Sequence, residues 1–285
     1  LRDLAKYMGS TTNFTATQAA EALNYMALAG YDAKVSATML PKVLDLAAAG
    51  MMDLGYASDI VTDAQTALGI QMGDMTTFVD QLAKTASSSN TSVSQLGEAL
   101  LTIGSTGRMV RGGFEELNIV LGVLANNGKK GSEAGNDLRR QLTRLVSPTK
   151  EAEVWFEKLG FSAYENGKLK ALPQIYQELG TALNSLSDER RNMAVSDIFG
   201  QYALAGANAL LNTTSEQWET LSEKIHDAEG AASDMAKIQQ ETLPGALTQL
   251  QSAFSGVKIE IFDLISPIAR EFVVTLTEGF TQAAD

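Results

Sequence analysis

The sequence predicts an all-α protein, and three observations support that fold class. The composition is rich in alanine, leucine and serine, with 7% aromatic residues and five prolines, which favours helices because unbranched side chains lose little conformational freedom there. Apolar residues recur at spacings of three and four, the period of one helix face. Residues that cap helix ends precede several of these runs. The predicted architecture is a duplicated multi-helix module, then a short β-hairpin connector and long C-terminal coiled-coil-like helices.

Length, composition and charge limit the classes of protein to which the chain can belong. Its 285 residues, 45% of them hydrophobic, can form a sizeable core. The absence of cysteine excludes disulfides, thiolate catalysis and cysteine-ligated metals. The net charge of −12 disfavours binding to nucleic acid or anionic lipid, because like charges repel. No basic-then-apolar leader is present and a helical pattern runs into the last residues, so we expect a fragment of a longer protein.

The charge is distributed unevenly along the chain. Residues 1–90 carry −4 (5 basic, 9 acidic), residues 91–150 carry +3 (8 and 5), and residues 151–285 carry −11 (9 and 20). The middle block is therefore the basic part of an acidic protein.

An internal repeat organises the first half of the sequence. A shift of 77 positions aligns residues 18–68 with residues 95–145 without a gap, and 12 of the 51 aligned positions are identical. The matched apolar residues fall at helix-core spacing, which favours a true duplication over the alternative of a chance alignment. We therefore predict a doubled helical module over residues 1–146. These apolar matches include Leu40, Val43 and Leu44 with Leu117, Val120 and Leu121.

Each copy of the repeat is predicted to contain three helices, with residues 74–86 as a bridge between the copies. Pro41 lies inside an apolar run and is predicted to interrupt a helix, because proline lacks the backbone donor and its ring clashes with the preceding turn. The predicted helix ranges are 16–28, 36–49 and 54–67, followed by 93–105, 114–126 and 132–145.

Capping residues mark the predicted helix starts. Asp53 and Asp74 precede two of them, and Ser92 has Gln95 at the spacing of a capping box. The polar run at residues 87–90 is predicted to end one helix before the next begins, because serine and asparagine side chains bind the free backbone groups of helix ends.

A connector is predicted over residues 147–172. Ser147 stands at a cap position, Pro148 at the first helical position and Gly160 at the stop. Asn166-Gly167 lies between short apolar runs and predicts a two-residue β-hairpin turn. The helical segment 173–212 is then predicted to hold helices at 173–186, 188–199 and about 202–211.

Residues 213–285 are predicted to form long amphipathic helices that are cut off at the end of the chain. Seven apolar residues are spaced by threes and fours over three heptads, which predicts a seam for self-association. Three heptads do not fix the number of chains that would associate. Pro267 should kink this helix. The seam residues are Leu247, Leu250, Phe254, Val257, Ile261, Leu264 and Ile268.

The sequence offers few candidates for catalysis or for binding a cofactor. His226 is the only histidine and is best interpreted as a solvated helix residue. The stretch 128–135 has glycines and lysines but lacks the ending of a nucleotide-binding loop, so a turn with a helix start is the better interpretation. The carboxylate pairs Glu115/Glu116 and Glu151/Glu153 are predicted to be solvated. We therefore predict no catalytic residue, no cofactor and no metal.

Two features allow other interpretations. Arg139, Arg140 and Arg144, within the basic block 108–150, form a candidate partner-facing patch, although no aromatic residues are interleaved with them as in nucleic-acid-binding surfaces. Residues 198–215 carry no charge, and a buried helix is preferred over a membrane span because the run contains several polar residues.

Six stretches together resemble the core region of phage tail tape measure proteins. They occur in the order found in that family and cover about residues 14–270. The stretches are FTATQAAEALNYMALAGYDA, LPKVLDLAAAGMMDLGYASDIVTDA, AKTASSSNTSVSQLGEAL, VLANNGKKGSEAGNDLRRQLTRLVSPTKEA, ALPQIYQELGTAL and VSDIFGQYALAGANALL.

The resemblance implies a structural role in a virion. Proteins of that family are long helical chains that fill the lumen of the tail tube, set tail length during assembly and leave ahead of the DNA. It implies that the chain is made in the host bacterial cytoplasm and ends in the tail lumen of a phage, prophage or contractile particle. It implies tail tube and tail tip or baseplate proteins and the tail assembly chaperone as partners. It also implies copies of the chain, in a trimer or a hexamer that would suit symmetric tube rings. It assigns no catalytic residue to this region.

Two rival functions stay open. The chain could be a helical binding module that contacts DNA or the chaperone through the basic block 108–150. It could also be a segment that acts on the membrane at ejection, through residues 198–215 and 247–280.

Overall fold

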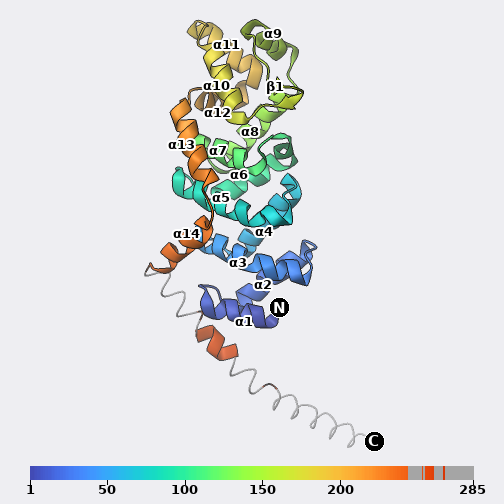
Figure 1. The fold of residues 1–285 in the computed structure, drawn as a ribbon, viewed down its shortest axis with the longest axis vertical. Helices are drawn as coiled ribbons and strands as arrows, with labels where there is room; N and C mark the ends of the chain where they lie inside the picture. The colour runs from blue at the N-terminus through green and yellow to red at the C-terminus, as the bar shows by residue number, and fades with distance from the viewer. Residues whose placement is uncertain (243–251, 253, 260–265, 267–285) are drawn as a thin grey trace, which may run out of the picture. The chain divides into compact units, whose positions relative to one another are not determined.

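A computed structural model describes residues 1–242, 252, 254–259 and 266 (Figure 1). Helices dominate this part of the chain, which confirms the all-α prediction. In chain order the elements are α1 (Arg2–Thr11), α2 (Ala16–Leu28), α3 (Ala33–Gly50), α4 (Leu54–Leu68), η1 (Met72–Asp74), α5 (Met75–Ser88), α6 (Val93–Ile103), η2 (Gly104–Met109), α7 (Gly113–Asn126), α8 (Gly131–Val146), α9 (Lys150–Leu159), β1 (Tyr164–Glu165), β2 (Lys168–Leu169), α10 (Leu172–Leu183), α11 (Asp188–Phe199), η3 (Gln201–Ala203), α12 (Leu204–Leu211), α13 (Ser215–His226) and α14 (Ala231–Gln240).

The chain forms two compact units. The terminal unit comprises residues 1–44 and 239–285, and the central unit comprises residues 45–238. The domain boundaries predicted from the sequence stay a prediction.

In the terminal unit, α1 packs closely on α2. A Cβ atom at Gly9 would lie 2.4 Å from the backbone nitrogen of Ala16, so only glycine allows this approach. A capping box between Thr15 and Gln18 begins α2. The Ser252 hydroxyl lies 2.8 Å from the carbonyl oxygen of Gly9, which ties the later segment to this pair of helices.

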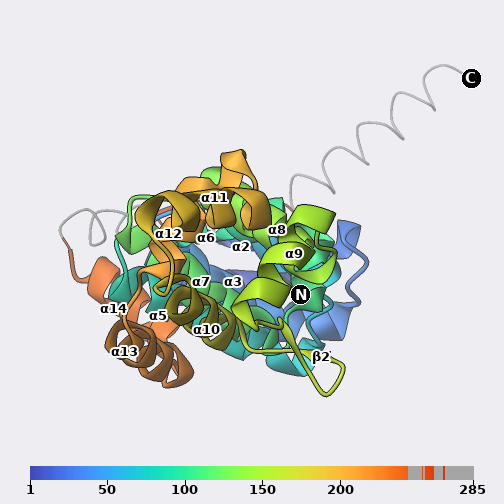
Figure 2. The ribbon, with the colours of Figure 1, turned by 90° about the horizontal axis from the view of Figure 1, so that it is seen from above.

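The central unit is built around the contact of α6 with α8, which also uses glycine. Figure 2 shows α9 and α11, another pair of helices that pack together in this unit. A Cβ atom at Gly135 of α8 would lie 2.5 Å from the carbonyl oxygen of Ala99 on α6. Around this contact the core contains fully buried apolar side chains, including Phe78, Leu96 and Leu138.

A second part of the central core is aromatic. Tyr176 of α10 stacks on Trp218 of α13, with ring centroids 6.3 Å apart, and on Phe199 of α11 at 6.2 Å. The Tyr176 hydroxyl donates a hydrogen bond of 2.9 Å to Oε1 of Gln141 on α8. This cluster joins helices that are more than 70 residues apart in the chain.

The helix bounds follow the 77-residue period of the sequence repeat. Shifted by 77, α2, α3 and α4 would span 93–105, 110–127 and 131–145, and the structure has α6, α7 and α8 at 93–103, 113–126 and 131–146. Three helices therefore recur at nearly the same positions in the two copies, although their lengths differ: 13, 18 and 15 residues in the first copy and 11, 14 and 16 in the second.

The predicted helix starts are confirmed in two places. Asp53 accepts hydrogen bonds from the backbone amides of Gly55 and Tyr56 at the start of α4. Ser92 accepts from the amide of Gln95 at the start of α6. The Gln95 side chain turns to the Thr91 hydroxyl, so the predicted capping box is only half formed.

Two predictions about helix starts are wrong, and a third is correct only in part. Pro41 does not break α3, which continues through it; Leu40 and Val43 beside it are fully buried, so packing outweighs the lost hydrogen bond. Asp74 stands at the N-cap position of α5, as predicted, but its side chain makes no cap hydrogen bond. Thr149, not Ser147, caps α9, since Thr149 accepts from the amide of Ala152.

The β-hairpin is confirmed at its predicted turn. Tyr164 pairs with Leu169 and Glu165 with Lys168 in antiparallel register. Asn166 and Gly167 have φ values of 51° and 73°, as a two-residue turn of this kind requires.

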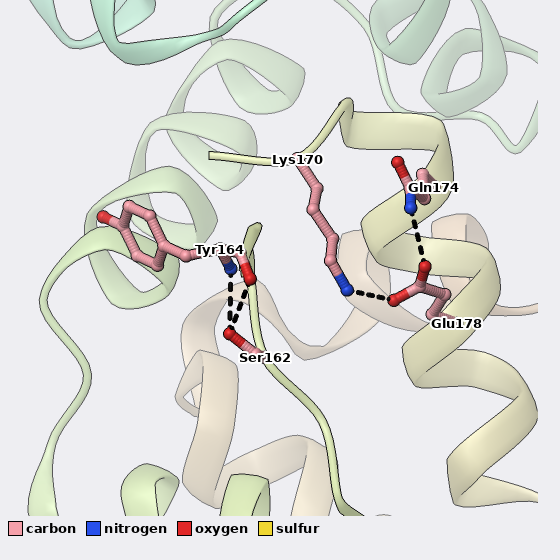
Figure 3. A network of polar contacts seen from close by, with 5 residues as sticks. All are labelled: Ser162, Tyr164, Lys170, Gln174 and Glu178. Atoms are coloured by element: carbon pink, nitrogen blue, oxygen red, sulfur yellow. Dashed lines mark hydrogen bonds and ion pairs between the residues drawn. The ribbon is translucent and has the colours of Figure 1, made fainter. Parts of the chain in front are cut away.

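The hairpin is joined to α10 by a polar network (Figure 3). The Lys170 ammonium lies 2.5 Å from Glu178 on α10, and Gln174 donates a hydrogen bond of 2.7 Å to the same carboxylate. The hydrogen bond from Lys170 holds the pKa of Glu178 below its usual range. On the hairpin itself, the amide of Tyr164 donates to the Ser162 hydroxyl.

The C-terminal part begins with two short helices, α13 of 12 residues and α14 of 10. Gly230, at φ 77°, stands in the break between them. Of the predicted seam, Phe254 and Val257 are described, and their side chains are 66% and 54% exposed. Leu247, Leu250, Ile261, Leu264 and Ile268 lie outside the described residues, so the seam stays a prediction.

Candidate partner-binding surface

The basic block 108–150 is divided by the fold, and much of it serves internal contacts. The Arg108 guanidinium donates hydrogen bonds to the carbonyls of Thr66 and Ala67, so it caps the C-terminal end of α4. Lys130 donates a hydrogen bond of 3.0 Å to Asn90. These basic groups are therefore used within the chain.

Lys129 is also engaged, at the start of α8. Its ammonium contacts Glu133 and lies 3.5 Å from Oδ2 of Asp137. Asp137 is buried, and burial raises its pKa although Lys129 opposes that shift. The stretch 128–135 is thus a turn followed by the first turn of α8, as predicted.

The three arginines of α8 differ from these basic residues because they form no ion pair in the described part of the chain. Arg139 and Arg140 are exposed and Arg144 is half-buried. Arg139 donates a hydrogen bond of 2.9 Å to the Asn136 side chain of its own helix.

An aromatic side chain that sequence reasoning missed completes this patch. Tyr202, on η3, is 86% exposed, and the guanidinium carbon of Arg140 lies 5.5 Å from the centre of its ring. Gly200, at φ 81°, makes the turn that places η3 beside α8. In the sequence, Tyr202 is marked only by its place in the uncharged run 198–215, and that run predicted a buried helix rather than an exposed aromatic ring. We name Arg139, Arg140, Arg144 and Tyr202 the arginine–tyrosine patch.

Most of the other apolar side chains of the uncharged run are buried or half-buried, as predicted for a buried helix, while Gln201, Ala205 and Asn212 are exposed. The run forms the end of α11, η3 and α12, in which Ala203, Ala207 and Leu210 are fully buried. Among the described residues, no single helix is long and apolar enough to cross a membrane. Helices α3 and α4 taken together have the length and composition of a membrane span, but the pair is bent by 118°.

The prediction that Glu115 and Glu116 are solvated is wrong. Glu116 accepts a hydrogen bond of 2.9 Å from the backbone amide of Leu172, so it caps α10 from another helix. Burial raises the pKa of Glu116. Glu115 accepts a hydrogen bond of 2.9 Å from Gln81 on α5 and lies 3.2 Å from Nδ1 of His226, whose side chain is 81% exposed.

Two hollows lie outside the arginine–tyrosine patch. In the terminal unit, an apolar hollow of about 540 Å³ lies between α1 and α2. In the central unit, a hollow of about 440 Å³ with polar walls lies between α7 and α13. Across the described residues, no group of three or more carboxylate, histidine or cysteine side chains could hold a metal ion.

Comparison with known proteins provides the family. The profile of the family described as phage-related minor tail protein matches residues 2–200. The chain is 30% identical over 272 residues, 95% of its length, to the protein named tape measure protein of Pneumococcus phage Dp-1. It is 24% identical over 282 residues, 98% of its length, to the probable tape measure protein of Escherichia phage P2. The chain spans 24% and 35% of these two relatives. No solved structure matches the chain at a significant level.

Proposed function

The chain belongs to the family of phage-related minor tail proteins, and from this premise we propose that it is a segment of a tape measure protein. In this proposal the whole protein sets tail length during assembly, fills the lumen of the tube and leaves when the DNA is ejected. The similarity to two proteins with tape measure names over at least 95% of the chain carries the proposal. The all-helical fold supports it.

Helix geometry explains how such a protein could measure length. A helix rises about 1.5 Å per residue, so its length grows linearly with sequence, and 285 residues in one helix would span roughly 430 Å. The longest described helix, α3, has 18 residues, and the helices pack on one another within each unit. We therefore propose that this segment is a compact module of a longer ruler, and that the measured length comes mainly from other segments.

Peptide mass spectrometry of virions tests the proposal. Peptides from residues 1–285 are expected in intact particles and in the material released on ejection, and they should be lost from emptied particles. The tube subunit is the control, because it should stay in both particles. Absence from intact virions, or retention in emptied ones, would contradict the proposal.

A second candidate function is contact with an acidic partner, either DNA or the tail assembly chaperone, through the arginine–tyrosine patch. Its specific support is an exposed ring beside arginines that have no carboxylate partner in the described residues. The triple variant Arg139→Ala, Arg140→Ala, Arg144→Ala should lose salt-dependent retention of DNA, or of the chaperone, by about tenfold or more. Unchanged retention of both partners would remove this function.

A further inference from the structure

We propose that α13 and the beginning of α14, residues 215–238, form a strap that detaches from the central unit before the rest of that unit unfolds. The proposal concerns an event within the chain and does not depend on the function proposed above. Its meaning for ejection rests on that function, because a module that must pass a narrow tube has to unfold. Unfolding would then begin at the strap, which is the last segment of the central unit along the chain.

The strap covers a surface of α5 and α7 that contains several buried polar side chains. It packs on α5 and α7, and four residues on these elements form the polar seam. Asn118, on α7, is fully buried, and neither atom of its side-chain amide has a hydrogen-bond partner among the described residues. Oε1 of Gln81 and Oγ of Ser89 also have none, whereas the Thr85 hydroxyl donates to its own helix. The polar seam thus comprises Gln81, Thr85, Ser89 and Asn118.

The three elements meet at Gly122, one turn after Asn118 on the same face of α7. A Cβ atom at Gly122 would lie 2.7 Å from Oγ of Ser89 and 2.9 Å from Cδ2 of Leu221 on the strap. This approach excludes larger side chains between α7 and α13. It also indicates that Asn118 faces the region where α13 covers α5 and α7.

Desolvation without a partner makes this interface costly. A buried amide that exchanges water for no protein partner destabilises the folded state, and the strap adds Nε1 of Trp218, which is buried and unpartnered within the described structure. Detachment returns all of these groups to water. The apolar side chains Trp218, Leu221 and Ile225 oppose detachment, since they are 5% exposed or less.

Helix α13 is also held by other contacts, including the stacking of Trp218 on Tyr176 of α10, whereas the α14 part of the strap has few buried side chains. In α14 the buried side chains are the small Ala232 and Ala236, while Ile238 is 65% exposed. Asp80 of α5 accepts hydrogen bonds of 3.0 and 3.1 Å from the amides of Gly230 and Ala232, which cap α14 from outside.

Local signals at both ends of α13 favour helix, although a helix of 12 residues is marginal in water without packing. Helix α13 begins with its own capping box, between Thr214 and Gln217. Lys224 lies in its last turn, where positive charge suits the helix dipole. Any loss of helix on detachment is confined to the 12 residues of α13 and to part of α14, so it changes the total helix content little.

Two probes on the full chain test the proposal. The chain has two tryptophans, so in a Trp155→Phe background the fluorescence of Trp218 reports detachment, and circular dichroism reports loss of helix. In a urea titration the fluorescence transition should precede the loss of helix. In the unmodified chain, amides of residues 215–226 should exchange with deuterium at least about tenfold faster than those of α6 and α8.

Asn118→Leu is the decisive variant, because leucine has the same branching and needs no hydrogen bond. It should slow exchange in residues 215–226 by about tenfold and move the fluorescence transition toward higher urea. Asn24→Leu, at an exposed position on α2, is the matched control and should leave exchange in the strap unchanged. Coincident transitions, exchange in the strap as slow as in α6 and α8, or faster exchange in Asn118→Leu would each overturn the proposal.

Discussion

At the scale of single residues, two carboxylates cap helices that are distant from them in sequence. Glu116 on α7 caps α10 through the amide of Leu172, 56 residues later. Asp80 on α5 caps α14 about 150 residues later. Helix α10 has no side-chain cap of its own, and the residue that precedes α14 is Gly230, which has no side chain to form one. Such caps replace local signals, so the sequence around each helix does not reveal them.

The position of Glu116 leads to a prediction about pH. Because burial raises its pKa in the folded chain, the folded state binds a proton more readily than the unfolded state. The stability that this group contributes is present below the ordinary glutamate pKa of 4.5 and is lost as the pH rises through the higher pKa of the folded chain. In the unmodified chain, titration of Glu116 should therefore lower the free energy of unfolding as the pH rises through that window. In Glu116→Gln this contribution is absent, so the free energy of unfolding should fall less steeply with pH.

Urea unfolding at a series of pH values from about 4 to 8 measures both slopes. Glutamine keeps an oxygen that can accept from Leu172, so the cap itself is retained. Glu165→Gln, at an exposed position on the hairpin, is a suitable control because it should leave the slope unchanged. Parallel slopes for Glu116→Gln and the unmodified chain would contradict the assignment of a raised pKa to this burial.

At the scale of elements, close helix pairs depend on glycines placed at their contact points. Helices α6 and α8 approach through Gly135, and α6 meets α4 through Gly97, where a Cβ atom would lie 2.4 Å from Cδ1 of Ile60. The two contacts differ in what a larger residue would meet. At Gly97 the obstacle is the end of a flexible side chain, whereas at Gly135 it is backbone, which cannot move without shifting a helix.

Gly135→Ala is therefore predicted to destabilise the central unit by about 2 kcal/mol, because overpacking at a backbone contact forces α6 and α8 apart. Urea unfolding followed by circular dichroism measures the change. The control is Gly73→Ala, since a Cβ atom at Gly73 meets no atom within 4 Å and its φ is not positive. Equal stability of Gly135→Ala and Gly73→Ala would show that the α6–α8 contact is looser than described.

At the scale of the whole molecule, the open question is whether the chain associates with copies of itself. Of the seven residues of the predicted seam, the structure describes Phe254 and Val257. Both of their side chains are more than half exposed. Large apolar side chains that are exposed in one chain are suited to burial against another. The proposed trimer or hexamer would use them in this way.

Substitution of this surface tests self-association without disturbing the packed units. Phe254→Asp and Val257→Asp should shift the chain from oligomer to monomer in light scattering or sedimentation, with about a tenfold or larger loss of association affinity for each. Their circular dichroism should stay unchanged because both positions are exposed. Tyr202→Asp, at an exposed site in the central unit, is the control. An unmodified chain that is a monomer at all concentrations would remove the self-association proposal.

Local chemistry is what the sequence by itself determined. Apolar spacing, capping residues and the Asn166-Gly167 turn act over a few residues, so they correctly predicted the all-α class, the caps at Asp53 and Ser92 and the hairpin. The 77-residue period likewise indicated helix ranges that recur in α6, α7 and α8.

Only the tertiary structure decided which side chains meet across the chain. It carried α3 through Pro41, buried Glu116 against Leu172 and placed Tyr202 over Arg140. It also gathered the unpartnered amides beneath the strap. These outcomes depend on contacts between residues tens to hundreds of positions apart, and packing energy at such contacts exceeds the local preference of any one residue.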